Sequence, residues 1–182
     1  MTGVPEAKLK ETDAGPVPEG EGWFVLDARD APWWRDDELG AAVVFEGEPG
    51  FPQLGFHVKV LLPGQPNCMY HGEPNQEDFL VISGECVLVI EGEESQLKAW
   101  DFVHCPPLTE HVFVGAGDGP CAIVMVGARR PGETFIYPVN DVAAKYGASV
   151  ETETSDPGEA YARFPKSART PYRDGDLPEQ RG

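Results

Sequence analysis

Short runs of β-branched and aromatic residues recur along the middle of the chain, and turn signals separate them. The runs cover residues 79–82, 86–90, 102–103, 112–114 and 122–126. Turn-forming clusters stand between them, as at Ser83-Gly84-Glu85 and Cys105-Pro106-Pro107. Strands at such regular spacing, with no long helical period between them, predict an all-β sandwich or barrel, and the jelly roll is the natural candidate. Two more strands are expected upstream, at 41–46 and 53–62.

Several of these runs are apolar at every position, whereas a sheet with one wet face alternates apolar and polar residues. Both faces of the sheets are therefore expected to be covered, either by a partner subunit or by the terminal segments of the chain. We expect a homodimer, in which Trp33-Trp34 serve as interface or cover residues. Ordinary packing of these two tryptophans under a loop is the alternative.

The length of 182 residues fits one domain with a sizeable core. Residues 1–22 are rich in Gly, Pro, Glu and Lys and predict a flexible or partner-wrapped arm. The barrel domain is expected at 23–138, and 139–182 should form a short helix and a surface tail. A helix is predicted over 140–146, capped by Asn140 and stopped by Gly147, and another helical stretch over 158–164.

The charge balance excludes some classes of partner. The chain has 14 basic and 31 acidic residues and a formal charge of −17. Nucleic acid and anionic membranes need a cationic face, so neither is expected as a partner. No apolar run is long enough to span a bilayer, and the N-terminus lacks a charged start followed by an apolar core. We expect a cytoplasmic protein with a small-molecule ligand or substrate.

Metal-ligating residue types gather in one short stretch. His71, Glu73 and Glu77 fall within seven positions, and His111 follows on a later predicted strand. Alternate residues of a strand share a face, so His71 and Glu73 can point the same way, and Glu77 can join them across the bend at Pro74-Asn75. Imidazole and carboxylate suit first-row divalent metals. The alternative to a metal site is that these are ordinary polar side chains near loops, solvated or hydrogen-bonded.

Residues 62–128 resemble the cupin superfamily, in a single-domain form. Pro63-Gly64 opens the first family motif, His71 takes its first histidine position, Glu77 its glutamate, and Gly84 its closing glycine. For the second motif the chain has Trp100-Asp101 and then Pro106 to His111. The resemblance implies a cupin-type jelly-roll barrel and a divalent ion, iron(II), zinc or manganese, held by His71, Glu73, Glu77 and His111.

The chain also departs from the family pattern. Glu73 stands where the second histidine is usual, Trp100 and Leu108 replace glycines, and Gly115 replaces an asparagine. A site with two carboxylates is harder than a cage of three histidines and one glutamate, which favours iron(II), manganese or zinc over copper(I). The resemblance implies a dioxygenase-like enzyme acting on a small oxygen-containing molecule. A Lewis-acid isomerase or epimerase and a non-catalytic binding cupin remain the alternatives.

We expect structural roles for the four cysteines and for the two histidines outside the motif. The four cysteines, at 68, 86, 105 and 121, have no Cys-x-x-Cys spacing and are interpreted as buried small hydrophobes. Cys105 is the one expected near a pocket. His57 and His104 lie off the motif positions and are expected in packing or pocket walls, with His57 as the substitute ligand should Glu73 point away.

Overall fold

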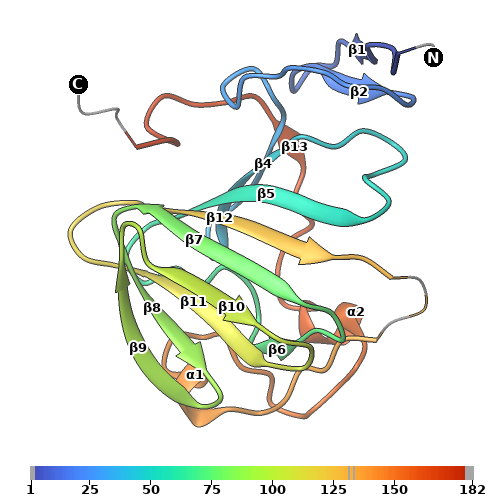
Figure 1. Ribbon diagram of the computed structural model, residues 1–182. Coiled ribbons are helices and arrows are strands. Elements are labelled where there is room, and N and C mark those ends of the chain that lie inside the picture. Colours follow the sequence, from blue (N-terminus) through green and yellow to red (C-terminus); the bar gives the residue numbers. More distant parts are fainter. Residues whose placement is uncertain (1–2, 131, 133, 179–182) are drawn as a thin grey trace.

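The computed structural model describes residues 3–130, 132 and 134–178, and antiparallel strands dominate it (Figure 1). In this described part, a seven-stranded sheet has the order β10-β7-β12-β5-β4-β3-β13. We call it the large sheet; its strands are β10 (Phe102–Cys105), β7 (Glu77–Ser83), β12 (Cys121–Ala128), β5 (Leu54–Leu61), β4 (Gly40–Val44), β3 (Trp33–Asp36) and β13 (Arg169–Thr170). The small sheet has the order β6 (His71–Gly72), β11 (Glu110–Ala116), β8 (Glu85–Ile90) and β9 (Glu93–Lys98).

The main core lies between the two sheets. It joins Phe79 and Ile123 of the large sheet to Leu88 and Phe113 of the small one, with three of the cysteines among the buried residues. Phe79 and Phe113 pack with ring centroids 4.7 Å apart. Alternate residues on each strand face this layer, which is the packing that the apolar runs predict. The all-β jelly-roll prediction is confirmed.

Segments outside the barrel cover the outer faces of both sheets. The helix α1 (Asp141–Ala144) buries Ala143 against Val89 and Val112 of the small sheet. On the large sheet, Trp33 and Val43 pack with Ala31 and with Tyr172 near the C-terminus. Over much of their area, the outer faces of the two sheets are therefore buried by other segments of the same chain. Trp33 is fully buried, while Trp34 keeps 38% of its surface.

The predicted helices are present in shorter form. Asn140 caps α1 as expected, since its side chain accepts hydrogen bonds from the backbone N–H groups of Val142 and Ala143. The second helix, α2 (Pro157–Ala160), begins at a proline and overlaps the start of the predicted stretch. None of the helices found in the described residues is long and apolar enough to cross a membrane.

Some strands were not predicted because they lack the apolar pattern. The edge strand β9 is almost entirely polar and exposed, and only its backbone pairing with β8 makes it a strand. Within the N-terminal segment, β1 (Lys8–Lys10) and β2 (Val17–Glu19) form a separate hairpin, visible above the barrel in Figure 1. The flexibility of residues 1–22 and the domain boundaries stay predictions; residues 1–2 and 179–182 lie outside the described part.

Candidate metal centre

The register of two short strands places His71 beside His111. β6 pairs with β11 in antiparallel fashion, and His111 lies directly opposite His71. Directly opposed residues of an antiparallel pair project to the same face. Their rings are consequently 5.1 Å apart between centroids, and both are buried, with 8% of His71 and 1% of His111 exposed.

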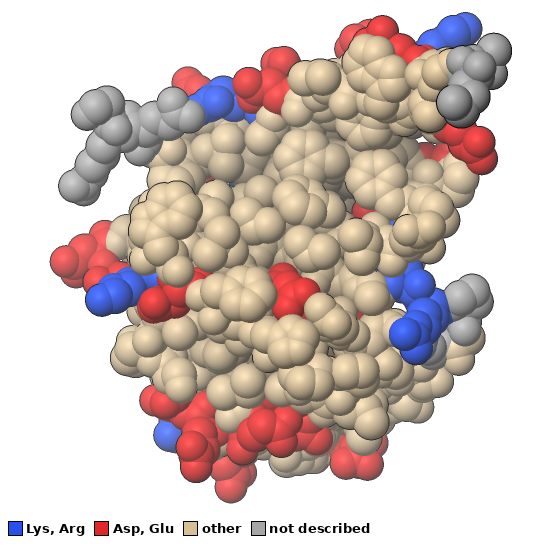
Figure 2. All heavy atoms as spheres, viewed as in Figure 1, with Lys and Arg blue, Asp and Glu red and all other residues tan. Residues whose placement is uncertain are grey.

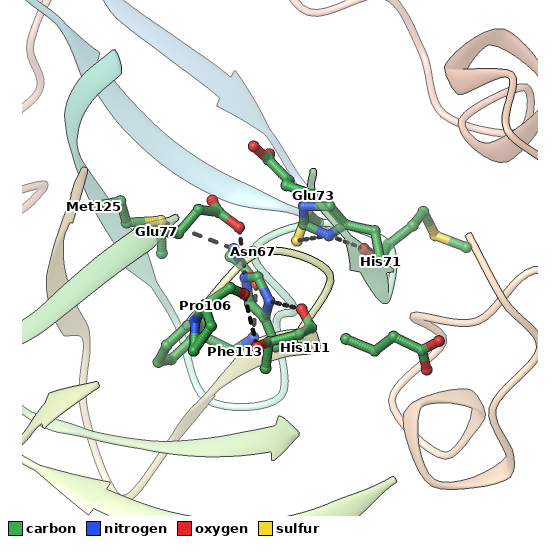
Figure 3. A network of polar contacts seen from close by, with 12 residues as sticks. Asn67, His71, Glu73, Glu77, Pro106, His111, Phe113 and Met125 are labelled. Atoms are coloured by element: carbon green, nitrogen blue, oxygen red, sulfur yellow. Dashed lines mark hydrogen bonds and ion pairs between the residues drawn. The ribbon is translucent and has the colours of Figure 1, made fainter. Parts of the chain in front are cut away.

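Glu77 reaches these histidines from the other sheet. It is the first residue of β7, where it pairs with Cys105 of β10 and Gly127 of β12. Its Oε2 lies 3.4 Å from His111 Nε2. One ligand atom from each of His71, Glu77 and His111 lies within 4.8 Å of the others (Figure 3). The three donors therefore meet between the two sheets, where neither sheet could assemble them alone.

Backbone carbonyls orient both imidazoles. His71 Nδ1 lies 2.9 Å from the Met69 carbonyl oxygen, and His111 Nδ1 lies 3.0 Å from that of Thr109. A carbonyl oxygen only accepts, so each Nδ1 carries the proton and donates it. In the neutral rings each Nε2 then has a free lone pair directed at a carboxylate. This is the arrangement that supports histidine ligation of a metal, because the hydrogen bond on the other nitrogen fixes tautomer and ring angle.

Glu73 stands beside this group on the His71 side. Its Oε1 lies 3.4 Å from His71 Nε2, and it is not among the three mutually close donors. Both contacts between Nε2 and a carboxylate measure 3.4 Å. Neighbouring ligands bonded at about 2.1 Å to one ion are separated by roughly 3.0 to 3.4 Å in octahedral or tetrahedral sites, and each of these two contacts has that spacing.

Burial changes the proton affinity of these groups in the absence of a cation. Burial, together with a smaller effect of the neighbouring His71, lowers the pKa of His111 to about 4. It raises the pKa of Glu77 to about 7, helped by repulsion from Glu73. For His71 burial lowers the pKa, but Cys68 and the two carboxylates outweigh it and hold the pKa above its usual value. The His111 imidazole is thus neutral at physiological pH.

The donors line a cavity of about 680 Å³. That volume suits a small organic ligand. Its wall includes Phe79, whose ring meets His111 edge-on at 5.1 Å, and Tyr137, which stacks on His71 at 5.8 Å. Tyr161 also lines it, and its hydroxyl accepts a hydrogen bond from the backbone N–H of Met69. Tyr161 lies in the stretch expected to be surface tail; nothing local in its sequence indicates that the tail folds back.

The structure also places the four cysteines and the two remaining histidines relative to the cavity. The structure corrects the expectation for Cys105, which is buried in the core, while Cys68 lines the cavity with its Sγ 3.5 Å from His71 Nδ1. All four cysteines are free thiols. His57 lines the cavity wall as predicted. The expectation for His104 is wrong: it is exposed on β10 and outside the cavity, and its Nδ1 lies 2.7 Å from Asp78 Oδ1.

Comparison with solved structures finds the same fold in several proteins. A sugar phosphate isomerase of the cupin superfamily from Silicibacter pomeroyi is 28% identical over 52% of this chain and 62% of its own length, with a TM-score of 0.47. The polyketide cyclase RemF from Streptomyces resistomycificus is 17% identical over 61% of this chain and 83% of its own, with a TM-score of 0.52. The chain spans 62% of the length of the Silicibacter pomeroyi protein and 56% of the length of a sugar phosphate isomerase structure from Acidithiobacillus ferrooxidans.

Sequence comparison defines the domain. No curated protein matches the chain. Residues 57–127 match the family described as Cupin domain, a range that contains His71, Glu77 and His111 and the strands between which they meet. Within the double-sheet barrel, residues 57–127 therefore form a cupin domain, and the protein is a cupin superfamily protein.

Proposed function

We propose that the protein is a metal-dependent cupin enzyme that acts on a small oxygen-containing organic molecule, with dioxygenase-like chemistry. One observation carries the proposal: two imidazoles and one carboxylate, His71, His111 and Glu77, meet in a cavity. Two histidines and one carboxylate with positions left open for substrate are typical of non-haem iron(II) oxygenases. We propose Glu73 as the fourth ligand, since it already touches His71 Nε2.

The protein groups have separate tasks in this proposal. When bound, iron(II) would supply oxidation by dioxygen, whereas zinc or manganese would supply polarisation of a carbonyl or hydroxyl group. His71 and His111 present Nε2 because their Nδ1 protons are held by backbone carbonyls. Phe79 and Tyr137 exclude water from one side of the imidazoles. Glu77 would lose its proton when a cation binds, so metal binding should release protons near neutral pH.

Elemental analysis of the purified protein tests the proposal. We expect about one divalent ion per chain, and loss of it in His111→Ala. His104→Ala is the matched control, because His104 is exposed and lies outside the cavity. Circular dichroism of both variants checks that they fold. Iron together with substrate-dependent oxygen uptake supports the oxygenase, and zinc or manganese supports the Lewis-acid enzyme. If the wild type contains no metal, even after incubation with these ions, the result contradicts the enzyme proposal and favours a non-catalytic binding protein.

We also propose that the protein is a homodimer, associated through the outer face of the large sheet. Phe102, Leu80, Val124 and Val58 lie in register across β10, β7, β12 and β5 on that face. Phe102 keeps 63% of its surface. Figure 2, which shows one face of the molecule, has mainly uncharged side chains across its middle, although the protein carries a formal charge of −17. An apolar region on so acidic a surface is the natural place for a second copy to bind.

A further inference from the structure

One wall of the cavity carries a cation that the metal centre does not use. Lys59 lies on β5 opposite Ile123 of β12, and Ile123 belongs to the core between the sheets. Opposed residues share a face, so Lys59 projects toward the interior. His57, two residues earlier, lies opposite the core residue Met125. Both Lys59 and His57 line the cavity that also contains His71, Glu77 and His111.

Lys59 has no partner of its own. Within the part of the chain that the structure describes, its ammonium makes no hydrogen bond or ion pair, and Cys68 and Asp36 act on it only through their charge. Burial lowers its pKa to about 8. Lys59 is half-buried, and a partly desolvated charge without a partner is unfavourable. Because no hydrogen bond or ion pair within the described residues accounts for a lysine at this position, an anionic ligand in the cavity is a physical reason for it.

The other basic residues at the cavity differ from Lys59. Arg129 is already engaged, since its Nη1 bonds Glu46 Oε2 and the Phe51 carbonyl oxygen, each at 2.8 Å. Arg130 is exposed, as expected for a residue near the entrance. His57 has its pKa lowered to about 4 by burial and by Lys59, so it stays neutral and does not compete for an anion. Lys59 is thus the interior cation that remains available.

We propose that Lys59 binds the anionic group of the cavity's ligand, and that this ligand is a small organic anion, a carboxylate or a phosphate ester. The charged group would lie against Lys59 Nζ while an oxygen elsewhere in the molecule reaches the His71, Glu77 and His111 group. Only this second contact rests on the proposed metal-dependent function. A ligand held at both ends is oriented as well as bound, which is what a site for a defined reaction needs.

Titration calorimetry with small probe anions tests this inference. The probes are pyruvate, malonate and glycerol 3-phosphate, each compared with an uncharged counterpart, pyruvamide, malonamide and glycerol. We expect at least one anion to bind the wild type, and Lys59→Met to weaken that binding by about tenfold or more. Lys59→Arg should retain most of it. Lys98→Met is the matched control, because Lys98 is exposed on β9, and it should bind as the wild type does. The preferred probe distinguishes carboxylate from phosphate.

Two measurements keep the inference separable from folding and from the metal. Lys59→Met should unfold at a temperature equal to or above that of the wild type without ligand, because it removes an unpaired charge. A fall of several degrees would instead assign Lys59 a structural role and overturn the inference. So would equal anion binding in Lys59→Met, or no binding of any probe at 10 mM, roughly the weakest affinity such a contact could have. Metal content is measured alongside: Lys59-dependent binding to a metal-free wild type supports this inference while ending the proposed metal-dependent function.

Discussion

Glu77 is the residue whose state depends most on whether a cation is present. Its pKa in the metal-free protein is raised to about 7, so between its ordinary value of 4.5 and 7 the folded state binds more protons than the unfolded state. The contribution of Glu77 to the stability of the metal-free protein therefore falls as pH rises through this window. The cause is that the Glu77 carboxylate has to ionise while it is buried and, to a smaller extent, beside Glu73.

Replacing that carboxyl group with an amide should reverse the loss. In EDTA, Glu77→Gln is expected to melt about 3 °C or more above the wild type at pH 8, and to differ little from it at pH 4.5. Calorimetric scans across pH measure the difference. A constant offset between the two proteins at every pH would contradict the assignment of the raised pKa to Glu77. With metal added, the order should invert, since the wild type binds the metal more tightly and gains more stability from it.

The role of Glu73 as a metal ligand can be tested by a single substitution. As a fourth ligand it should contribute to affinity, so Glu73→Gln is expected to weaken divalent-metal binding by roughly 10- to 100-fold. Glu77→Gln should weaken it more, because Glu77 belongs to the three mutually close donors. Competition titration with a fluorescent chelator measures both. Glu93→Gln on the exposed strand β9 is the control. Unchanged affinity in Glu73→Gln would leave Glu73 as a neighbour of His71 only.

Among the elements, the turn between β7 and β8 shows why a motif residue is needed. Gly84 has a φ of +73°, and a Cβ there would lie 2.4 Å from the carbonyl oxygen of Pro120. The family resemblance places a glycine at this position, and the close backbone approach supplies the physical reason.

We expect Gly84→Ala to lower the free energy of unfolding by on the order of 2 kcal/mol or more. Gly119→Ala is the matched control, since Gly119 has nothing within 4 Å of its added Cβ. Urea denaturation measures both variants. Equal stability of the two alanine variants would show that the backbone near Pro120 moves away from the added Cβ with no loss of stability.

Element prediction from the sequence succeeded where apolar alternation was strong and failed where it was absent. The strands β7, β8, β11 and β12 follow from their apolar runs. β6 has only two residues, His71 and Gly72, and β13 has two as well, so neither carries a pattern. Such strands exist because a neighbour offers free backbone groups, as β11 does to β6. That pairing, invisible locally, is the one that brings the imidazoles together.

At the scale of the whole molecule, the surface charge and the apolar face set the expected association. Light scattering should give a mass near twice 19.8 kDa. Because each chain carries a formal charge of −17, added salt should strengthen the dimer by screening repulsion. Phe102→Glu is expected to yield monomers, whereas Leu62→Glu, at a residue 54% exposed in the turn after β5, should not. A monomeric wild type at high salt would contradict the proposal.

The sequence by itself determined the fold class and the main ligand candidates. Alternation and turn residues act over a few positions, so the strand runs and the grouping of His71, Glu77 and His111 as motif residues can be read directly from the chain. Only the tertiary structure decided how these residues meet: the β6–β11 register, the approach of Glu77 from the opposite sheet, the inward face of Lys59 and the return of Tyr161 to the cavity. Those relations depend on contacts between distant segments, whose geometry is set by packing of the whole barrel and leaves no local pattern.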